Sequence, residues 1–295
     1  MLSIAGGILL GLLVGSFLNV VIYRLPIMME NEWRAHCREI MSDTTAAAGI
    51  APASIETSPP EPFNLVQPRS RCSNCGAMVT AWQNIPVISW LWLGGQCASC
   101  KARISARYPI IEILTGLLSG LVVWKFGLSI EAGAFLLLTW ALVALTMIDI
   151  DHQLLPDSIT YPLLWLGLTF SLLQQTGTTS AFPDVQSSLI GAIAGYLSLW
   201  SVYWAFKLVT GKEGMGYGDF KLLAALGAWL GWQMLPLVIM LSALVGALVG
   251  LCMILFLGRD RQIPIPFGPY LAGAGLIALF WGTEISNGYI SFSGI

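Results

Sequence analysis

Charged residues are scarce in this chain of 295 residues. Aspartate, glutamate, lysine and arginine make up only 10% of it, whereas hydrophobic residues make up 56%, and the mean hydropathy is +0.75. The few charges gather in short stretches rather than along helix faces. This composition excludes an ordinary soluble domain and predicts an all-α polytopic membrane protein.

A signal for export and removal is also lacking at the start of the chain. The first apolar run has no basic residue before it and no small-residue cleavage site after it, because it leads into Asn19-Val-Val-Ile-Tyr-Arg-Leu-Pro26. A secretory signal peptide needs both features. We therefore expect this run to be a retained membrane span.

Long apolar runs, by contrast, recur through the chain. A spanning helix needs about 20 residues to cross a hydrocarbon layer of ~30 Å, and several windows reach that length. The sequence predicts about eight spans, approximately at residues 2–23, 109–124, 131–148, 158–173, 189–209, 220–232, 235–257 and 267–281.

Basic residues are almost absent from one side of the predicted topology. With segment 24–108 in the cytoplasm, only Lys125 of the 14 lysines and arginines lies outside, and loop 174–188 has none. This positive-inside bias predicts that both termini are periplasmic. The basic residues expected inside are Arg24, Arg34, Arg38, Arg69, Arg71, Lys101, Arg103, Arg107, Lys207, Lys212, Lys221, Arg259 and Arg261.

Two aspartates stand where apolar and charged segments meet. Asp149 lies in Met147-Ile-Asp-Ile-Asp-His-Gln-Leu-Leu-Pro-Asp157, and Asp219 lies in Gly216-Tyr-Gly-Asp-Phe-Lys221. Both fall on the predicted cytoplasmic side. A carboxylate near hydrocarbon is costly, so such residues are functional candidates. If the fold brings them together, repulsion and desolvation make the pair share one proton, as in an aspartic protease that activates water.

The span after Asp219 is short. Its 14 residues reach roughly 21 Å as a helix, less than the hydrocarbon thickness, so Asp219 is expected in a recess below the membrane surface. Gly214, Gly216 and Gly218 surround this position. Glycines permit backbone conformations closed to other residues and let a substrate strand come close, although such a loop also suits a phosphate or a plain turn.

Other ionisable residues compete for a catalytic role. Asp151 is two positions from Asp149, a turn of about 200° in a helix, so both cannot face Asp219 unless the helix has ended. Asp157 follows a proline and is expected to cap a helix. His152 fits a solvated or capping residue better than a base or metal ligand. Glu112, near the start of a span, fits a helix N-terminus and remains a reserve candidate.

Four cysteines form two CxxC pairs in the long polar segment, Cys72-Ser-Asn-Cys75 and Cys97-Ala-Ser-Cys100. This spacing suits two zinc knuckles that form one tetrahedral site, and a reducing cytoplasm favours zinc over disulfides. A redox role or an iron centre are the alternatives. Because the domain is small, a structural metal would supply much of its folding free energy.

The other two cysteines have no partner at metal spacing. Cys37 is expected as a loop thiol and Cys252 as a small apolar residue in a span. Segment 30–62 is expected to be flexible, and its six acids indicate a solvated linker or, alternatively, a stretch that attracts a basic substrate segment.

Together these motifs resemble one family, the type IV prepilin leader peptidases and N-methyltransferases, which are membrane aspartic proteases of the GxGD type. The resemblance covers almost the whole chain. Its residues are Gly15-Ser-Phe-Leu-Asn-Val-Val-Ile-Tyr-Arg-Leu-Pro26, the four cysteines, Arg107-Tyr-Pro109 with Glu112, the Asp149 to Asp157 motif and Gly216-Tyr-Gly-Asp219.

The resemblance implies that Asp149 and Asp219 are the catalytic pair and that Cys72, Cys75, Cys97 and Cys100 bind zinc. It implies three regions: a first span at 1–25, a cytoplasmic loop with the zinc domain at 26–108, and a membrane-embedded peptidase domain at 109–295. The implied location is the bacterial inner membrane, with the catalytic face cytoplasmic.

The implied substrates are prepilins and type II secretion pseudopilins, whose short basic leader would be cleaved after glycine. The new N-terminus would then be methylated with S-adenosylmethionine. The sequence lacks a nucleotide-binding fingerprint after a strand, so no residue is assigned to this donor. Membrane lipids are the other expected partners, and nucleic acid is not one.

Three alternatives differ in chemistry. A proton-coupled transporter would use the same aspartates, but the cysteine domain and the lack of obvious internal repeats argue against it. A thiol oxidoreductase would place its CxxC pairs on the oxidising side of the membrane. A non-catalytic secretion assembly factor would tolerate substitution of both aspartates.

Overall fold

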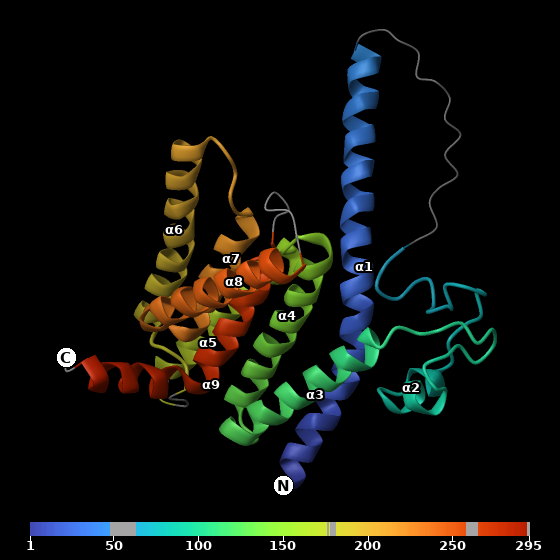
Figure 1. Cartoon of the computed structure of the whole chain (residues 1–295), viewed down its shortest axis with the longest axis horizontal. Helices are drawn as coiled ribbons and strands as arrows, with labels where there is room; N and C mark the ends of the chain where they lie inside the picture. The colour runs from blue at the N-terminus through green and yellow to red at the C-terminus, as the bar shows by residue number, and fades with distance from the viewer. Residues whose placement is uncertain (48–62, 176, 178–180, 258–264, 294–295) are drawn as a thin grey trace. The chain divides into compact units, whose positions relative to one another are not determined.

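The computed structural model describes residues 1–47, 63–175, 177, 181–257 and 265–293, and within them the chain is almost entirely helical (Figure 1). Strand pairing in this described part is limited to two isolated bridges, Arg71 with Met78 and Gln96 with Arg103. The helices are α1 (Leu2–Ala47), η1 (Ala81–Asn84), α2 (Ile88–Trp92), α3 (Arg107–Phe126), α4 (Ile130–His152), α5 (Asp157–Gln175), α6 (Val185–Thr210), α7 (Tyr217–Leu230), η2 (Trp232–Met234), α8 (Leu235–Leu257) and α9 (Gly268–Ser293).

Each of the eight predicted spans coincides with one of the long helices, which confirms an all-α polytopic membrane protein. Five helical segments among the described residues are long and apolar enough to cross a membrane, so the number eight stays a prediction. These five are Leu2–Ser42, Arg107–Phe126, Ile130–His152, Val185–Thr210 and Trp232–Phe256.

The chain forms two compact units. One unit is Ile8–Leu117, and the other consists of Met1–Gly7 together with Leu118–Ile295. The predicted limits of the three regions, after residues 25 and 108, remain a prediction. The basic residues Arg259 and Arg261, which entered the predicted topology, lie outside the described residues.

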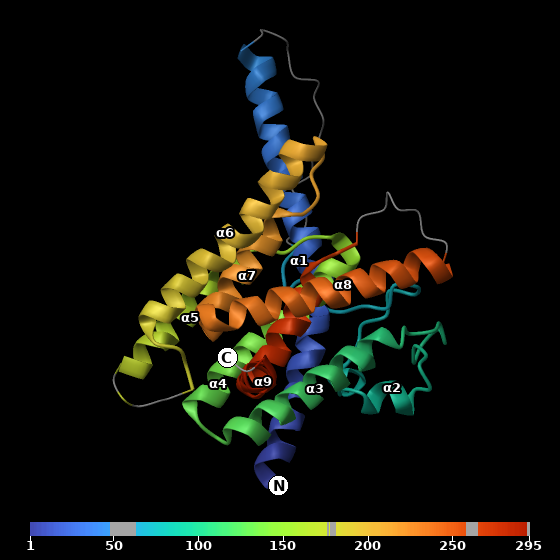
Figure 2. The ribbon, with the colours of Figure 1, turned by 60° about the vertical axis from the view of Figure 1, so that its left-hand side comes forward.

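Helix α7 is the core of the larger unit. It packs against α5, α6, α8 and α9 (Figure 1; Figure 2), and ten of its 14 residues are buried. Its apolar side chains include Phe220 and Trp229, and the indole N–H of Trp229 donates to the Leu163 carbonyl at 2.8 Å. A helix buried on all sides has little freedom to move, so α7 holds the residues of its first turn in fixed positions.

Two glycines allow α6 and α7 to approach very closely. A Cβ atom built on Gly191 would lie 2.2 Å from the Gly227 carbonyl oxygen, and one built on Gly227 would lie 2.1 Å from the Gly191 oxygen. The Ser188 hydroxyl also donates to the Ala228 carbonyl across this contact. Close backbone approach through small residues is typical of helix pairs in membranes.

The expectation of a flexible segment from residue 30 onward is wrong for its first part, because α1 continues through Pro26 to Ala47. Glu30 and Arg34 form an i,i+4 ion pair at 2.6 Å, and Arg38 Nε donates to the Arg34 carbonyl at 3.1 Å. Such pairs support a helix in water, and this stretch is rich in helix-forming residues. Cys37 is therefore an exposed helical thiol, and residues 48–62 lie outside the described residues.

Three residues of the first-span motif, one small and two polar, hold the smaller unit together. A Cβ on Gly15 would lie 2.8 Å from Glu112 Cα, and Asn19 Nδ2 donates to the Tyr108 carbonyl at 3.2 Å. The buried guanidinium of Arg24 donates to the carbonyls of Asn64 at 2.8 Å and Pro68 at 2.6 Å. These bonds connect α1 to α3 and to the chain before the cysteines.

Candidate active site and metal centre

Asp149 lies in the last turn of α4, and its side chain is only 5% exposed. Its Oδ2 accepts a hydrogen bond from the backbone N–H of Gly268 at 3.0 Å. Gly268 is the first residue of α9, where backbone N–H groups have no partner within the helix and the helix dipole is positive. The start of α9 thus supplies a donor and a favourable field for a carboxylate that has left bulk water.

Asp219 is the third residue of α7 and is 6% exposed. Its backbone N–H donates to the Gly216 carbonyl at 3.3 Å, which begins the helix. In the described part of the structure its buried Oδ1 has no hydrogen-bond partner. A buried oxygen without a partner is costly, so Oδ1 suits a group that arrives from outside the fold.

Asp149 and Asp219 both belong to the larger unit. Leu155, in the loop after α4, links their surroundings: it lies against Gly218, beside Asp219, and against Gly268, beside Asp149. The C-terminal end of α4 therefore meets the N-terminal ends of α7 and α9. This arrangement brings the two predicted site aspartates into one buried place.

The glycines before Asp219 act differently from the expectation. Gly214, Gly216 and Gly218 all avoid positive φ, so they do not supply conformations closed to other residues. A Cβ on Gly218 would lie 2.7 Å from Leu155 Cβ, and one on Gly214 would lie 2.8 Å from a ring carbon of Phe206. At these two positions glycine is required because neighbouring side chains occupy the space of a Cβ.

The competing acids of the first motif lie elsewhere. Helix α4 continues to His152, so Asp151 and His152 are both exposed while Asp149 is buried. Asp157 is the first residue of α5 and forms an ion pair with Lys221, with distances of 2.6 and 2.8 Å to its two carboxylate oxygens. That pair joins α5 to α7 on the surface.

Glu112 lies in the smaller unit, where its carboxylate is buried and engaged. Its Oε2 accepts a hydrogen bond from the Val87 backbone N–H at 2.8 Å, and Ser16 is a further partner. Val87 has a φ of 59°, unusual for a β-branched residue. The contacts indicate that Glu112 anchors the start of α2.

The four predicted metal ligands are gathered in one place. The sulfur atoms of Cys72, Cys75, Cys97 and Cys100 all lie within 4.8 Å of one another, so they could hold a metal ion. Four thiolates at such spacing are typical of a closed tetrahedral zinc site. Cys252, on α8, is exposed and is not a member of this group.

The two CxxC pairs form matching turns. The N–H of Gly76 donates to the Cys72 carbonyl at 2.9 Å, and the N–H of Lys101 donates to the Cys97 carbonyl at 3.0 Å. Asn74 Nδ2 lies 3.6 Å from Cys100 Sγ, and this contact, with an amide hydrogen bond from Ala102, lowers the pKa of the Cys100 thiol to about 6. A more acidic thiol binds a metal at a lower pH.

Two residues around the aspartates escaped sequence reasoning. Gly268 and Leu155 carry no ionisable group, and neither is near Asp219 in the sequence. Leu155 belongs to the Met147–Asp157 motif, but nothing in that motif assigns it a place beside Asp219. The available signal for Gly268 is Pro266-Phe-Gly-Pro269, where a proline at the first turn of an apolar run marks a helix start. That signal predicts the helix but not the partner of its first N–H.

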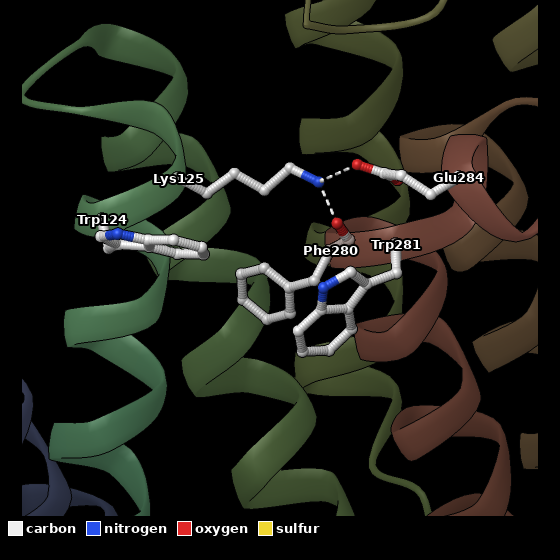
Figure 3. Close-up of a pocket in the computed structure, with 5 residues that line it drawn as sticks. All are labelled: Trp124, Lys125, Phe280, Trp281 and Glu284. Carbon is white, nitrogen blue, oxygen red and sulfur yellow. Dashed lines mark hydrogen bonds and ion pairs between the residues drawn. The ribbon is translucent and has the colours of Figure 1, made fainter.

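A cavity of ≈ 350 Å³ in the larger unit is lined by Trp124, Lys125, Phe280, Trp281 and Glu284 (Figure 3). The Lys125 ammonium donates to the Phe280 carbonyl and pairs with Glu284 at 3.6 Å. The lining contains neither of the buried aspartates. Its two charged side chains pair with each other, so we assign no chemistry to it.

Two family models match successive parts of the chain. Residues 9–126 match the model of the bacterial peptidase A24 N-terminal domain, and residues 136–251 match that of the type IV leader peptidase family. No solved structure matches.

Curated relatives cover nearly the full length. A protein of Stutzerimonas stutzeri is 56% identical over 286 residues, 97% of this chain and 93% of that relative. One from Pseudomonas aeruginosa is 56% identical over 287 residues, again 97% and 93%. One from Dichelobacter nodosus is 48% identical over 279 residues, 95% and 92%. All three are named prepilin leader peptidase/N-methyltransferase.

Proposed function

Because the chain belongs to the type IV leader peptidase family, we propose that it cleaves the leader from prepilins with Asp149 and Asp219 as its catalytic pair. The observation that carries the assignment is the burial of two aspartates whose neighbouring glycines both lie against Leu155, with one aspartate oxygen that has no hydrogen-bond partner in the described structure. The family favours this activity over a transporter, a thiol oxidoreductase or an assembly factor.

The proposed chemistry is hydrolysis by general acid and base. One carboxylate, ionised, takes a proton from a water molecule whose oxygen attacks the carbonyl carbon of the scissile peptide bond. The other, protonated, donates to the carbonyl oxygen. When the C–N bond breaks, the leaving nitrogen takes up a proton from the pair. The two carboxylates titrate as a unit, so the roles are assigned to the pair.

The Gly268 N–H has a positioning role in this scheme. It fixes one oxygen of Asp149. Asp219 Oδ1, which has no hydrogen-bond partner in the described structure, is the oxygen that can meet water or the substrate carbonyl. Buried charges that are held before substrate arrives need little rearrangement during the reaction.

The substrate proposed is a prepilin or a type II secretion pseudopilin whose basic leader is cut after glycine. The same charge rule that orients the enzyme keeps a basic leader on the cytoplasmic side, while an apolar helix stays in the bilayer. The catalytic face is then cytoplasmic and both termini are periplasmic. Asp149 ends one helix and Asp219 begins another, as a site at one membrane face requires.

Zinc is the metal we propose for the cysteine cluster, since four thiolates match its preference. Bound zinc would stabilise the fold of this segment. N-methylation of the new N-terminus, with S-adenosylmethionine as methyl donor, is proposed from the name of the relatives, and no residue is assigned to the donor.

The test is cleavage of a purified prepilin by the full-length protein in liposomes, comparing Asp149→Asn and Asp219→Asn with the unchanged enzyme. An amide keeps the shape and removes the titrating group. Each substitution should lower the cleavage rate by a factor of about 10² to 10⁴, the range expected for loss of a general acid or base.

Asp151→Asn is the matched control, because Asp151 is on the same helix two positions away and is exposed. It should cleave at the rate of the unchanged enzyme. Retained cleavage in Asp149→Asn or Asp219→Asn, with folding and metal content intact, would remove that residue from the pair.

A further inference from the structure

Every charged residue in the segment that carries the cysteines is basic. Between residues 63 and 107 there is no aspartate or glutamate, and the five charged side chains are all positive. A zinc ion with four thiolates would contribute two negative charges, and the segment would still be positive. The basic residues are Arg69, Arg71, Lys101, Arg103 and Arg107, and the first four are exposed.

The same segment exposes large apolar side chains at η1 and α2. Trp82 is 79% exposed, Ile88 61%, Leu91 64% and Trp92 86%, and none of the residues of α2 is buried. We call these four side chains the η1–α2 edge. Scattered apolar residues are common on surfaces, but four in eleven positions, two of them tryptophan, indicate a binding surface.

Hydrogen bonds within the smaller unit place the η1–α2 edge at the end of a membrane span. The Val87 N–H, one residue before α2, donates to Glu112, which lies in the second turn of the apolar helix α3. Arg24, at the end of the apolar part of α1, binds the carbonyls of Asn64 and Pro68 just before the cysteines. The edge is therefore tied to the first two turns of α3, beside Gly15 and Ser16 of α1, which lie about 12 Å from Arg24 along α1 on the side of its apolar run.

We propose that the η1–α2 edge inserts into the headgroup layer of the membrane and that the basic residues around the cysteines bind anionic phospholipid. Tryptophan is enriched at this depth because its ring is apolar and its N–H is polar. Charge complementarity selects the lipid: a basic segment without acids is attracted to an anionic surface, and each basic residue there favours binding about fivefold. Residues 63–107 then lie on the membrane surface, whether or not Asp149 and Asp219 are catalytic.

The test uses the full-length protein in nanodiscs of phosphatidylcholine, alone or mixed equally with phosphatidylglycerol. The photoreactive residue benzoylphenylalanine replaces Trp92 in one variant and Trp33 in a second, and mass spectrometry identifies what each crosslinks. Trp33 is the matched control: it is also an exposed tryptophan of the smaller unit, but it lies nine residues beyond Arg24 on α1, about 14 Å further along the helix.

The Trp92 variant should crosslink to phospholipid several times more than the Trp33 variant, and more in the anionic mixture than in phosphatidylcholine alone. Equal lipid crosslinking at both positions would overturn the proposal. So would crosslinks from position 92 that lead mainly to a second copy of the chain or to another protein, because the edge would then be a protein interface.

A charge variant tests the lipid choice separately. Arg69→Gln combined with Arg103→Gln, in the Trp92 variant, should clearly reduce the rise in lipid crosslinking that phosphatidylglycerol causes, because three of the five basic residues remain, while leaving crosslinking in phosphatidylcholine unchanged. Metal content is measured alongside, so that misfolding of residues 63–107 is recognised. A rise of undiminished size without these two charges would overturn the assignment to anionic lipid.

Discussion

The cysteine cluster and the aspartate pair are assembled in opposite ways. Cys72 and Cys100 are 28 positions apart, and each CxxC turn is closed by backbone hydrogen bonds within six residues. Asp149 and its donor Gly268 are 119 positions apart, and only the packing of α4, α7 and α9 brings them together. The first is a local structure that a metal can stabilise, and the second depends on the packing of several helices.

Metal removal should produce the largest difference between the cysteine cluster and the aspartate pair. Structural zinc contributes on the order of 10 kcal/mol to the folding of small zinc domains, so a chelator should unfold residues 70–104. Hydrogen exchange of the full-length protein in detergent should show that the N–H groups of Cys72, Gly76, Cys97 and Lys101 lose protection. The amides of α7, buried among other helices, should keep theirs.

Cys252→Ser is the control for this experiment, since Cys252 is exposed on α8 and outside the cluster. It should leave exchange and metal content unchanged. If α7 exchanged faster after chelation, the larger unit would depend on the metal and the contrast between the regions would fail.

The same contrast decides what the sequence could predict. The CxxC spacing is read within one short segment, so all four cysteines could be predicted as a group, and the structure gathers their sulfur atoms in one place. The aspartates could be predicted because charge is rare near apolar runs. Gly268 and Leu155 could not, because Gly268 contributes a backbone N–H and Leu155 contributes packing against residues far away in the sequence. Apolar length located the helices. The extension of α1 to Ala47 could not be predicted in this way, because residues 30–47 are polar and are followed by turn-forming residues.

A single methyl group at the helix start should break the aspartate site. In Gly268→Ala the added Cβ would lie 2.6 Å from Asp149 Oδ2, so the carboxylate must move away from the N–H that holds it. A shift of about 1 Å in a reacting group costs on the order of 10²-fold in rate. We expect prepilin cleavage in liposomes to fall by that factor, while exchange at the cysteine turns stays unchanged.

Gly273→Ala provides the comparison on the same helix, because a Cβ there meets nothing within 4 Å. It should cleave normally and be slightly more stable, since alanine favours a helix by up to about 1 kcal/mol over glycine. Equal loss of cleavage in both variants would mean that α9 tolerates no substitution, and the specific role of the Gly268 contact would be refuted.

The smallest expected effect is on metal retention and comes from a difference between the two cysteine turns. Gly76 and Lys101 occupy equivalent positions, one residue after the second cysteine of each pair, and both have positive φ, 71° and 61°. A side chain in this left-handed region costs roughly 1–2 kcal/mol, partly offset because glycine is more flexible when unfolded. Lys101→Gly should therefore tighten metal retention against a competing chelator by a few fold, and Gly76→Ala should weaken it by a similar factor.

Lys101→Ala removes the charge but keeps the strained backbone, so it should retain metal as the unchanged protein does. If Lys101→Ala improved retention as much as Lys101→Gly, the lysine charge would explain the difference between the turns, and their likeness in backbone conformation would carry no energetic consequence.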